Sequence, residues 1–179
     1  IGRKDYILVD NEKGLNILSR TGKQRVKPKQ NIIPSGNSWG LHNKSFVGTN
    51  SKGSLVEISE NGMVQTTELD LSEGHYISVS PEHVVTLSEN ILTINGLSKT
   101  LDYGLYLPPQ IHEQANRTFF SVVDQQAGKV YVFDEQAELV PGFPVFGNSQ
   151  IDVDLTAPNE ISFVVKGDDN AVLLYNKKL

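Results

Sequence analysis

Residues 45–62, SFVGTNSKGSLVEISENG, contain the pattern that decides the fold. Two short apolar runs, at residues 45–48 and 55–58, are joined by a polar turn that ends in Gly53, and Asn61-Gly62 follows the second run. Asn-Gly supplies the positive φ angles that a tight β-turn requires. The segment therefore predicts an antiparallel hairpin that turns at once into a further strand.

The same pattern returns along the whole chain. Five apolar runs begin 40, 36, 39 and 42 residues apart, at residues 15–18, 55–58, 91–94, 130–133 and 172–175. Another apolar run precedes each of them, at residues 6–9, 45–48, 83–87, 118–123 and 161–165. We expect outer strands at 23–27, 63–69, 97–101 and 138–140, and inner strands at 76–79 and 151–154. No stretch keeps a 3.6-residue apolar period over three turns, so no helix is expected.

Four strands in about 40 residues match the length and strand count of one β-propeller blade. The sequence therefore predicts a single all-β domain, a β-propeller-like array of four-stranded antiparallel blades. The four to five blades would fall near residues 1–29, 37–70, 75–103, 107–146 and 150–179. The first repeat lacks an inner strand and the last lacks an outer one, and the chain starts at Ile1. We therefore expect an incomplete ring from a larger protein, with a β-sandwich as the alternative fold.

The amino-acid composition and the distribution of charge exclude several classes of function. The absence of cysteine excludes disulfides, thiolate metal sites and a cysteine nucleophile. No apolar stretch is long enough for a transmembrane helix, and the net charge of −5 argues against nucleic-acid binding. Residues 1–52 have a charge balance of +7, with the densest basic run at residues 20–29, and residues 53–179 have a balance of −12. The basic run indicates either an anion- or partner-binding face or a lysine-protected edge strand.

The repeat text resembles two propeller families. Residues 17–23, Ile-Leu-Ser-Arg-Thr-Gly-Lys, resemble the pyrroloquinoline-quinone-type repeat, whose docking tryptophan is replaced here by Val26. Residues 152–161 resemble the FG-GAP-type loop, which binds calcium through closely spaced carboxylates. Only Asp152, Asp154, Asn159 and Glu160 remain as calcium ligands under that resemblance. The resemblance implies a propeller scaffold without quinone cofactor, and by analogy a bacterial cell-envelope or periplasmic location.

Catalytic motifs are absent from the sequence: there is no P-loop, nucleophile elbow or zinc-binding His-Glu-x-x-His. We therefore expect a protein that is not an enzyme and has no cofactor. The candidate residues for binding a ligand or partner are Trp39, His42, Tyr103 and Tyr106. Aromatic rings of this kind stack on a sugar or on a partner's side chain, or they pack between blades. His75 and His112 are expected near inner strands.

Two functions follow from these observations. The first is a non-catalytic interaction scaffold that binds a protein partner or the remaining blades of its parent chain. The alternative is a propeller that binds a carbohydrate or another small ligand, with or without hydrolysis of that ligand. The first rests on the repeat, the missing catalytic motifs and the uneven charge. The second rests on Trp39 and the two tyrosines.

Overall fold

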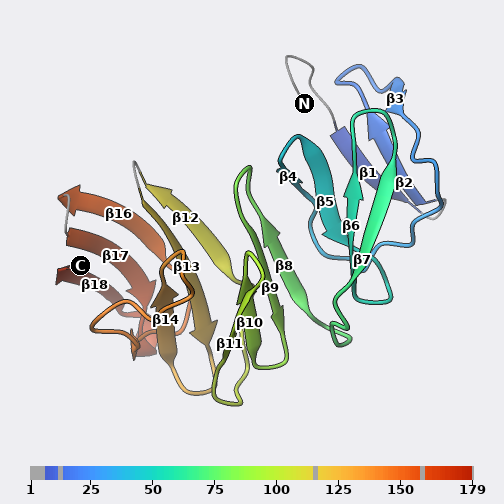
Figure 1. The fold of residues 1–179 in the computed structure, drawn as a ribbon. Coiled ribbons are helices and arrows are strands. Elements are labelled where there is room, and N and C mark those ends of the chain that lie inside the picture. Colours follow the sequence, from blue (N-terminus) through green and yellow to red (C-terminus); the bar gives the residue numbers. More distant parts are fainter. Residues whose placement is uncertain (1–6, 12–13, 115–116, 158–159, 179) are drawn as a thin grey trace. The chain divides into compact units, whose positions relative to one another are not determined.

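Short antiparallel hairpins, joined by glycine and asparagine turns, build the whole fold. The computed structural model describes residues 7–11, 14–114, 117–157 and 160–178. The chain forms two compact units, residues 1–84 and 85–179, and each is described by itself. The ribbon in Figure 1 shows the order of the strands.

Five antiparallel sheets follow one another along the described part of the chain. The first contains β1 (Ile7–Asn11), β2 (Gly14–Leu18) and β3 (Gln24–Val26). The second contains β4 (Gly40–His42), β5 (Ser45–Thr49), β6 (Ser54–Ile58) and β7 (Val64–Glu68). The third contains β8 (Tyr76–Val79), β9 (Val84–Ser88), β10 (Ile91–Ile94) and β11 (Leu97–Thr100).

The last two sheets belong to the second unit. One contains β12 (Gln110–Gln114), β13 (Arg117–Asp124), β14 (Lys129–Phe133) and β15 (Val145–Phe146). The other contains β16 (Asp152–Ala157), β17 (Glu160–Lys166) and β18 (Val172–Lys178), with a single 3₁₀ turn, η1 (Asp168–Asn170), before β18. Within the described residues no helix is long and apolar enough to cross a membrane.

The predicted all-β repeat is confirmed. All five apolar runs lie in strands, namely β2, β6, β10, β14 and β18. Among the described residues the first and last sheets have three strands each, as the expected lack of an inner strand in the first repeat and an outer strand in the last predicted. Within each sheet the strands lie side by side in the order in which they occur in the sequence, as the predicted hairpins require.

The outer strand predicted at residues 138–140 is present only in part: the Val140 N–H donates to the Val132 carbonyl at 2.9 Å, but no continuous strand forms there. Leu139 makes only an isolated bridge to Phe133, after which the chain turns and returns to β14 as β15. Pro141 and Pro144 lie between these two points, and proline has no N–H to donate to a ladder. The outer strand is therefore split in two by its prolines.

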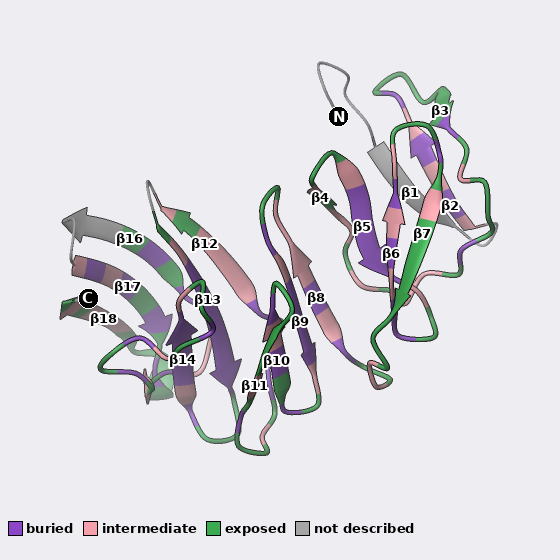
Figure 2. Ribbon diagram, in the orientation of Figure 1, coloured by how far each residue is buried: buried purple, intermediate pink, exposed green. Residues whose placement is uncertain are grey.

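Each unit has its own apolar core between facing sheets (Figure 2). In the first unit, Ile17 of β2 and Val56 and Ile58 of β6 are fully or almost fully buried in one cluster. In the second unit, Val130 and Val132 of β14 meet Ile161, Phe163 and Val165 of β17. Within each unit, two neighbouring sheets thus share one apolar core.

Candidate partner-binding loop

The four candidate residues lie in both units. Trp39 and His42 are in the first unit and Tyr103 and Tyr106 in the second, so we treat them as two separate pairs. His75 and His112 are divided between the units in the same way.

Trp39 is packed on its own sheet. Its indole ring lies over Gly48 of β5 so closely that a Cβ atom at Gly48 would overlap the ring. The ring is half-buried against the first unit's core, and its Nε1 is buried without a hydrogen-bond partner. Trp39 therefore has the packing role that the sequence analysis gave as one of two possibilities for it, the other being stacking on a ligand or partner.

His42 and His75 of the first unit are held by neutral hydrogen-bond partners. His42 places Nδ1 3.3 Å from the Ser80 carbonyl, which can only accept, so Nδ1 carries the proton. Its Nε2 then accepts from the Asn43 side chain at 2.9 Å. His75 is buried, with its ring nitrogens 2.8 Å from the Ser72 carbonyl and 2.9 Å from Thr49 Oγ1.

His112 lies on β12 in the second unit, where its Nε2 is 2.8 Å from Ser121 Oγ. Burial lowers the pKa of His112 to about 4, and the Asp152 carboxylate opposes this shift only in part. The imidazole is therefore neutral near pH 7. Because Ser121 belongs to β13, this contact makes His112 part of the packing between β12 and β13.

The calcium-type residues lie on strands, and Asp152 and Asp154 fall in the inner strand that was expected at residues 151–154. Asp152 and Asp154 alternate onto the exposed face of β16, opposite Val164 and Ser162 of β17. Glu160 starts β17, and Asn159 lies outside the described residues. Among the residues that the structure describes, no three acidic or histidine side chains gather as a metal site would require.

Tyr103 and Tyr106 lie on the connection between β11 and β12, and they have opposite environments. Tyr106 is buried, and its hydroxyl donates a 2.5 Å hydrogen bond to the carbonyl of Asp102. Burial, together with the nearby Asp124 carboxylate, raises the pKa of Tyr106, so the phenol stays protonated. Tyr103 is 86% exposed, and Leu105 beside it is 61% exposed.

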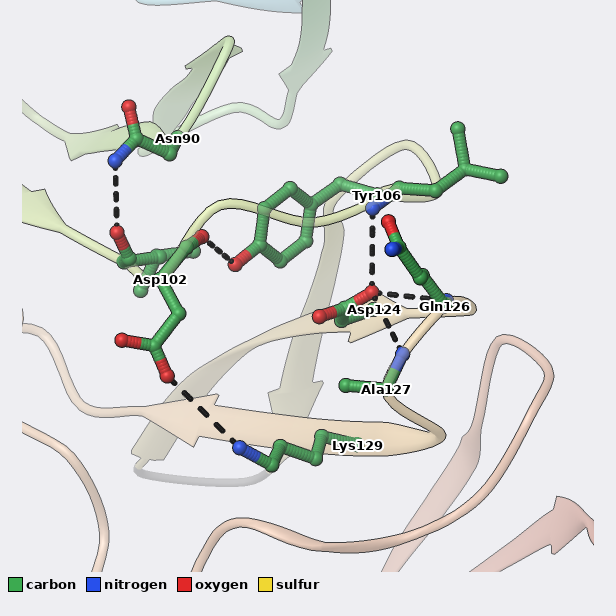
Figure 3. Close-up of polar contacts among 9 residues, drawn as sticks. Asn90, Asp102, Tyr106, Asp124, Gln126, Ala127 and Lys129 are labelled. Atoms are coloured by element: carbon green, nitrogen blue, oxygen red, sulfur yellow. Dashed lines mark hydrogen bonds and ion pairs between the residues drawn. The ribbon is translucent and has the colours of Figure 1, made fainter.

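The buried carboxylate of Asp124 holds the middle of this connection (Figure 3). Its Oδ1 accepts the backbone N–H of Leu105 at 3.2 Å, of Gln126 at 2.9 Å and of Ala127 at 3.1 Å. Gly104 packs directly on the same carboxylate, with no room for a side chain. One side chain thus joins the connection to the β13–β14 turn.

Further hydrogen bonds fix both ends of the connection. Asn90 Nδ2 donates to the Leu101 carbonyl at 2.8 Å, and the Leu101 N–H donates to the Asn90 carbonyl at 2.8 Å. At the other end the Leu107 N–H donates to the Val123 carbonyl at 2.9 Å. Asp102 also lies 3.8 Å from Lys129 Nζ (Figure 3). We name residues 101–107 the Tyr103 loop; its backbone is held at three places while Tyr103 and Leu105 face solvent.

Sequence reasoning missed Leu105 and Asp124. Asp124 ends the apolar run of β13 and is followed by Gln-Gln-Ala-Gly, which is a signal for a side chain that caps a turn. Its bond to Leu105 crosses 19 residues, and no local pattern predicts it. Leu105 stands among apolar neighbours, so only the fold shows that it faces solvent.

A separate groove of about 330 Å³ lies at the far end of β13. Its lining combines apolar Phe119 and Val140 with charged Arg117, Asp134 and Glu135. The Asp134 carboxylate stabilises its own turn, because its Oδ1 accepts the backbone N–H groups of Gln136 and Glu138. The groove adds no candidate residue from the sequence.

No protein-family model matches the sequence, and no curated protein matches it closely enough to count as a relative. Solved structures match its fold. BamB from Moraxella catarrhalis is 14% identical with a TM-score of 0.57, over 94% of this chain and 53% of that one. Hsv2p from Kluyveromyces lactis is 11% identical with a TM-score of 0.57, over 99% and 70% of the two chains.

A third structure, BBS1N in complex with ARL6DN, is 14% identical with a TM-score of 0.52, over 97% of this chain and 62% of that one. The chain thus spans about half of BamB and less than two thirds of BBS1N. At such identities the match concerns the fold alone. BamB and Hsv2 are β-propeller proteins, so the five antiparallel sheets are β-propeller-like.

Proposed function

We propose that this chain is a non-catalytic β-propeller scaffold that binds another protein through the Tyr103 loop. The observation that carries the proposal is the pair of exposed apolar side chains, Tyr103 and Leu105, on a backbone fixed by Asn90, Asp124 and Val123. Loops held on a rigid scaffold are where proteins commonly place their binding residues.

The physical argument is preorganisation. An exposed tyrosine offers a large contact area with few rotatable bonds, and tyrosine is frequent among the residues that dominate interface energies. Because the loop backbone is already fixed in the free protein, binding costs little further conformational entropy. A mobile loop with the same side chains would bind more weakly.

The surroundings indicate the chemistry of the partner. Asp102 of the loop and Lys129 of β14 form an exposed pair of opposite charges. A polar rim around an apolar centre is the usual anatomy of a protein interface. We therefore propose a folded protein partner with an apolar pocket that receives the Tyr103 ring and polar groups that meet Asp102 and Lys129.

The fold comparison supports the proposal in general terms, since a propeller of similar fold, BBS1N, was solved in complex with another protein. The bacterial cell-envelope setting is the part of the proposal that rests on the repeat resemblance. Fractionation of cells that produce the full-length protein tests that part separately.

The test is site-specific crosslinking in the native cell. A photo-crosslinking phenylalanine at position 103 should capture one protein, and the same probe at Leu97, an exposed residue of β11, should not. The purified partner should then bind the Tyr103→Ser/Leu105→Ser variant at least about tenfold more weakly, while Leu97→Ser binds as wild type.

Three results would overturn the proposal: no specific crosslink at position 103, equal crosslinking at position 97, or unchanged affinity of the double variant. Saturable binding of a glycan that is lost in Trp39→Ala and kept in Tyr103→Ser/Leu105→Ser would instead support the carbohydrate-binding alternative.

A further inference from the structure

A hollow of about 280 Å³ in the first unit has a basic lining. It lies beside β2, β3 and the segment that follows β3. The buried side chains of Leu15 and Ile32 and the ring of Pro28 supply its apolar lining. The polar side chains of its described lining are two lysines and four amides: Lys27, Lys29, Asn16, Gln24, Gln30 and Asn31. We name it the basic hollow; it includes part of the basic run at residues 20–29, which the proposed function leaves unused.

The segment after β3 has a fixed backbone at this hollow. The Lys29 N–H donates to the Gly62 carbonyl at 2.9 Å, and the Lys27 carbonyl packs so closely on Gly62 that a Cβ atom there would overlap it. Gly62 belongs to the turn between β6 and β7. Farther along the segment, Asn31 Oδ1 lies against Gly14 at the start of β2. The lysine and amide side chains therefore project from a backbone that is already in place.

The positive charge of the basic hollow does not protect a strand edge. Arg25 lies within the outer strand β3 and fits that role. Lys27 and Lys29 follow the end of β3, so they are not part of its edge. Among the described residues neither ammonium group has a carboxylate partner, and Lys29 Nζ lies 3.1 Å from Met63 Sδ, a weak acceptor. The hollow therefore offers uncompensated positive charge to an anion.

We propose that the basic hollow binds a phosphate monoester. Each ammonium group has three N–H donors and each side-chain amide has two, and none of the described lining residues is acidic. A phosphate monoester carries three strong acceptor oxygens and a charge of about −1.5 to −2 at pH 7. Two lysines compensate such a charge, whereas a carboxylate would leave one of them unpaired.

The size of the hollow restricts the ligand. Pockets for drug-sized molecules have volumes of about 300–1,000 Å³, and the basic hollow is just below that range. It therefore receives a single phosphate group with few further atoms. That group belongs either to a small soluble molecule or to a lipid headgroup.

Titration of the full chain with glycerol 3-phosphate, followed by NMR, tests the site. The side-chain amide signals of the basic hollow should shift saturably, and the amide signal of Gln65, an exposed residue of β7, should not. Acetate is the comparison ligand, with one negative charge and two acceptor oxygens. It should bind at least about tenfold more weakly than glycerol 3-phosphate, because it engages one ammonium group in place of two.

A matched pair of double variants separates the hollow from the general charge of the basic run. Lys27→Gln/Lys29→Gln removes two charges inside the hollow and should weaken glycerol 3-phosphate binding at least about tenfold. Lys23→Gln/Arg25→Gln removes two charges from the same run outside the lining. It should weaken binding less than about threefold in about 0.15 M salt, because charges that do not touch the ligand are screened.

An isosteric substitution gives a second test that leaves the lysines in place. Gln24→Glu adds a carboxylate to the lining of the hollow without a change in size and should also weaken binding at least about tenfold. Gln65→Glu makes the same change on β7 and should bind as wild type. The backbone amide spectrum of each variant verifies that it has folded.

A vesicle arm distinguishes the two sources of the phosphate. The probe is phosphatidylcholine vesicles with added phosphatidic acid, whose headgroup is a phosphate monoester. Sedimentation of the wild type with these vesicles, and its loss in Lys27→Gln/Lys29→Gln, would identify a lipid headgroup. Saturable glycerol 3-phosphate binding without vesicle sedimentation would identify a soluble ligand.

The inference is overturned if glycerol 3-phosphate at millimolar concentration causes no saturable shift, if acetate binds equally well, or if Lys27→Gln/Lys29→Gln binds like its control. The Tyr103→Ser/Leu105→Ser variant should bind glycerol 3-phosphate as wild type, because the Tyr103 loop belongs to the other unit. Failure of this inference and failure of the proposed function are therefore distinguishable.

Discussion

Gly104 lies against the side-chain carboxylate of Asp124, at a distance that leaves no space for a Cβ atom. The carboxylate cannot move aside freely, because its Oδ1 accepts three backbone N–H groups from Leu105, Gln126 and Ala127. This contact therefore joins the Tyr103 loop to the end of β13.

We predict that Gly104→Ala destabilises the fold by about 1–3 kcal/mol, the usual cost of inserting a methyl group into a well-packed site. Urea unfolding measures the change. Tyr103→Ala, at the neighbouring exposed position, should alter the unfolding free energy by less than about 0.5 kcal/mol. Equal effects of the two substitutions would contradict the steric argument.

Asp124→Ala should destabilise the protein more than Asp124→Asn. Alanine leaves three N–H groups without their acceptor, at about 1–3 kcal/mol for each one that stays buried and unpaired. Asparagine keeps one acceptor oxygen at the same place and should lose less. Unfolding free energies of the two variants give the comparison, and hydrogen exchange of the Leu105 amide reports the local effect. Fast exchange of the Leu105 amide in the wild type would show that Asp124 does not hold the backbone of the Tyr103 loop in place.

The sequence predicted the strands well because their signal is local. Alternating apolar runs and glycine or asparagine turns lie within ten residues of each other, so β5 and β6 could be placed directly. The outer strand at 138–140 forms only a bridge to β14, because Pro141 and Pro144 follow it and interrupt the pairing before β15. The inner strand expected at residues 151–154 was found as β16, and the alternation of Asp152 and Asp154 along the chain is the local signal for it.

The candidate site was less predictable. Tyr103 and Tyr106 are three residues apart and equally aromatic, yet one is exposed and the other buried. The difference arises from Asp124, a residue of the next sheet, which determines the path of the loop backbone. Such a contact depends on how sheets pack, and no spacing in the sequence contains it.

Acid should destabilise the second unit through His112. Its folded-state pKa of about 4 is below the ordinary value of 6.5, so the unfolded chain takes up the proton first as the pH falls. Stability is therefore full above pH 6.5, is lost between pH 6.5 and 4, and changes no further below that through this group. The loss should reach about 3 kcal/mol at most, by linkage.

The measurement compares wild type with His112→Gln in urea at pH 7 and pH 4.5. Glutamine does not titrate. The wild type should therefore lose more stability than His112→Gln between pH 7 and pH 4.5. A difference that is the same at both pH values would show that His112 titrates normally in the folded protein.

Trp39 should behave as a packing residue whose N–H has no role. Because its Nε1 is buried without a partner, Trp39→Phe removes an unsatisfied group while keeping a ring over Gly48. We expect it to cost less than about 1.5 kcal/mol, whereas Trp39→Ala should cost about 3–5 kcal/mol from the lost packing. Gly48→Ala should also destabilise, because its methyl group would displace the indole ring. Thermal and urea unfolding of the three variants decide the order. If Trp39→Phe were as damaging as Trp39→Ala, the indole N–H would have a partner in solution, and the reading of Trp39 as a packing residue would fail.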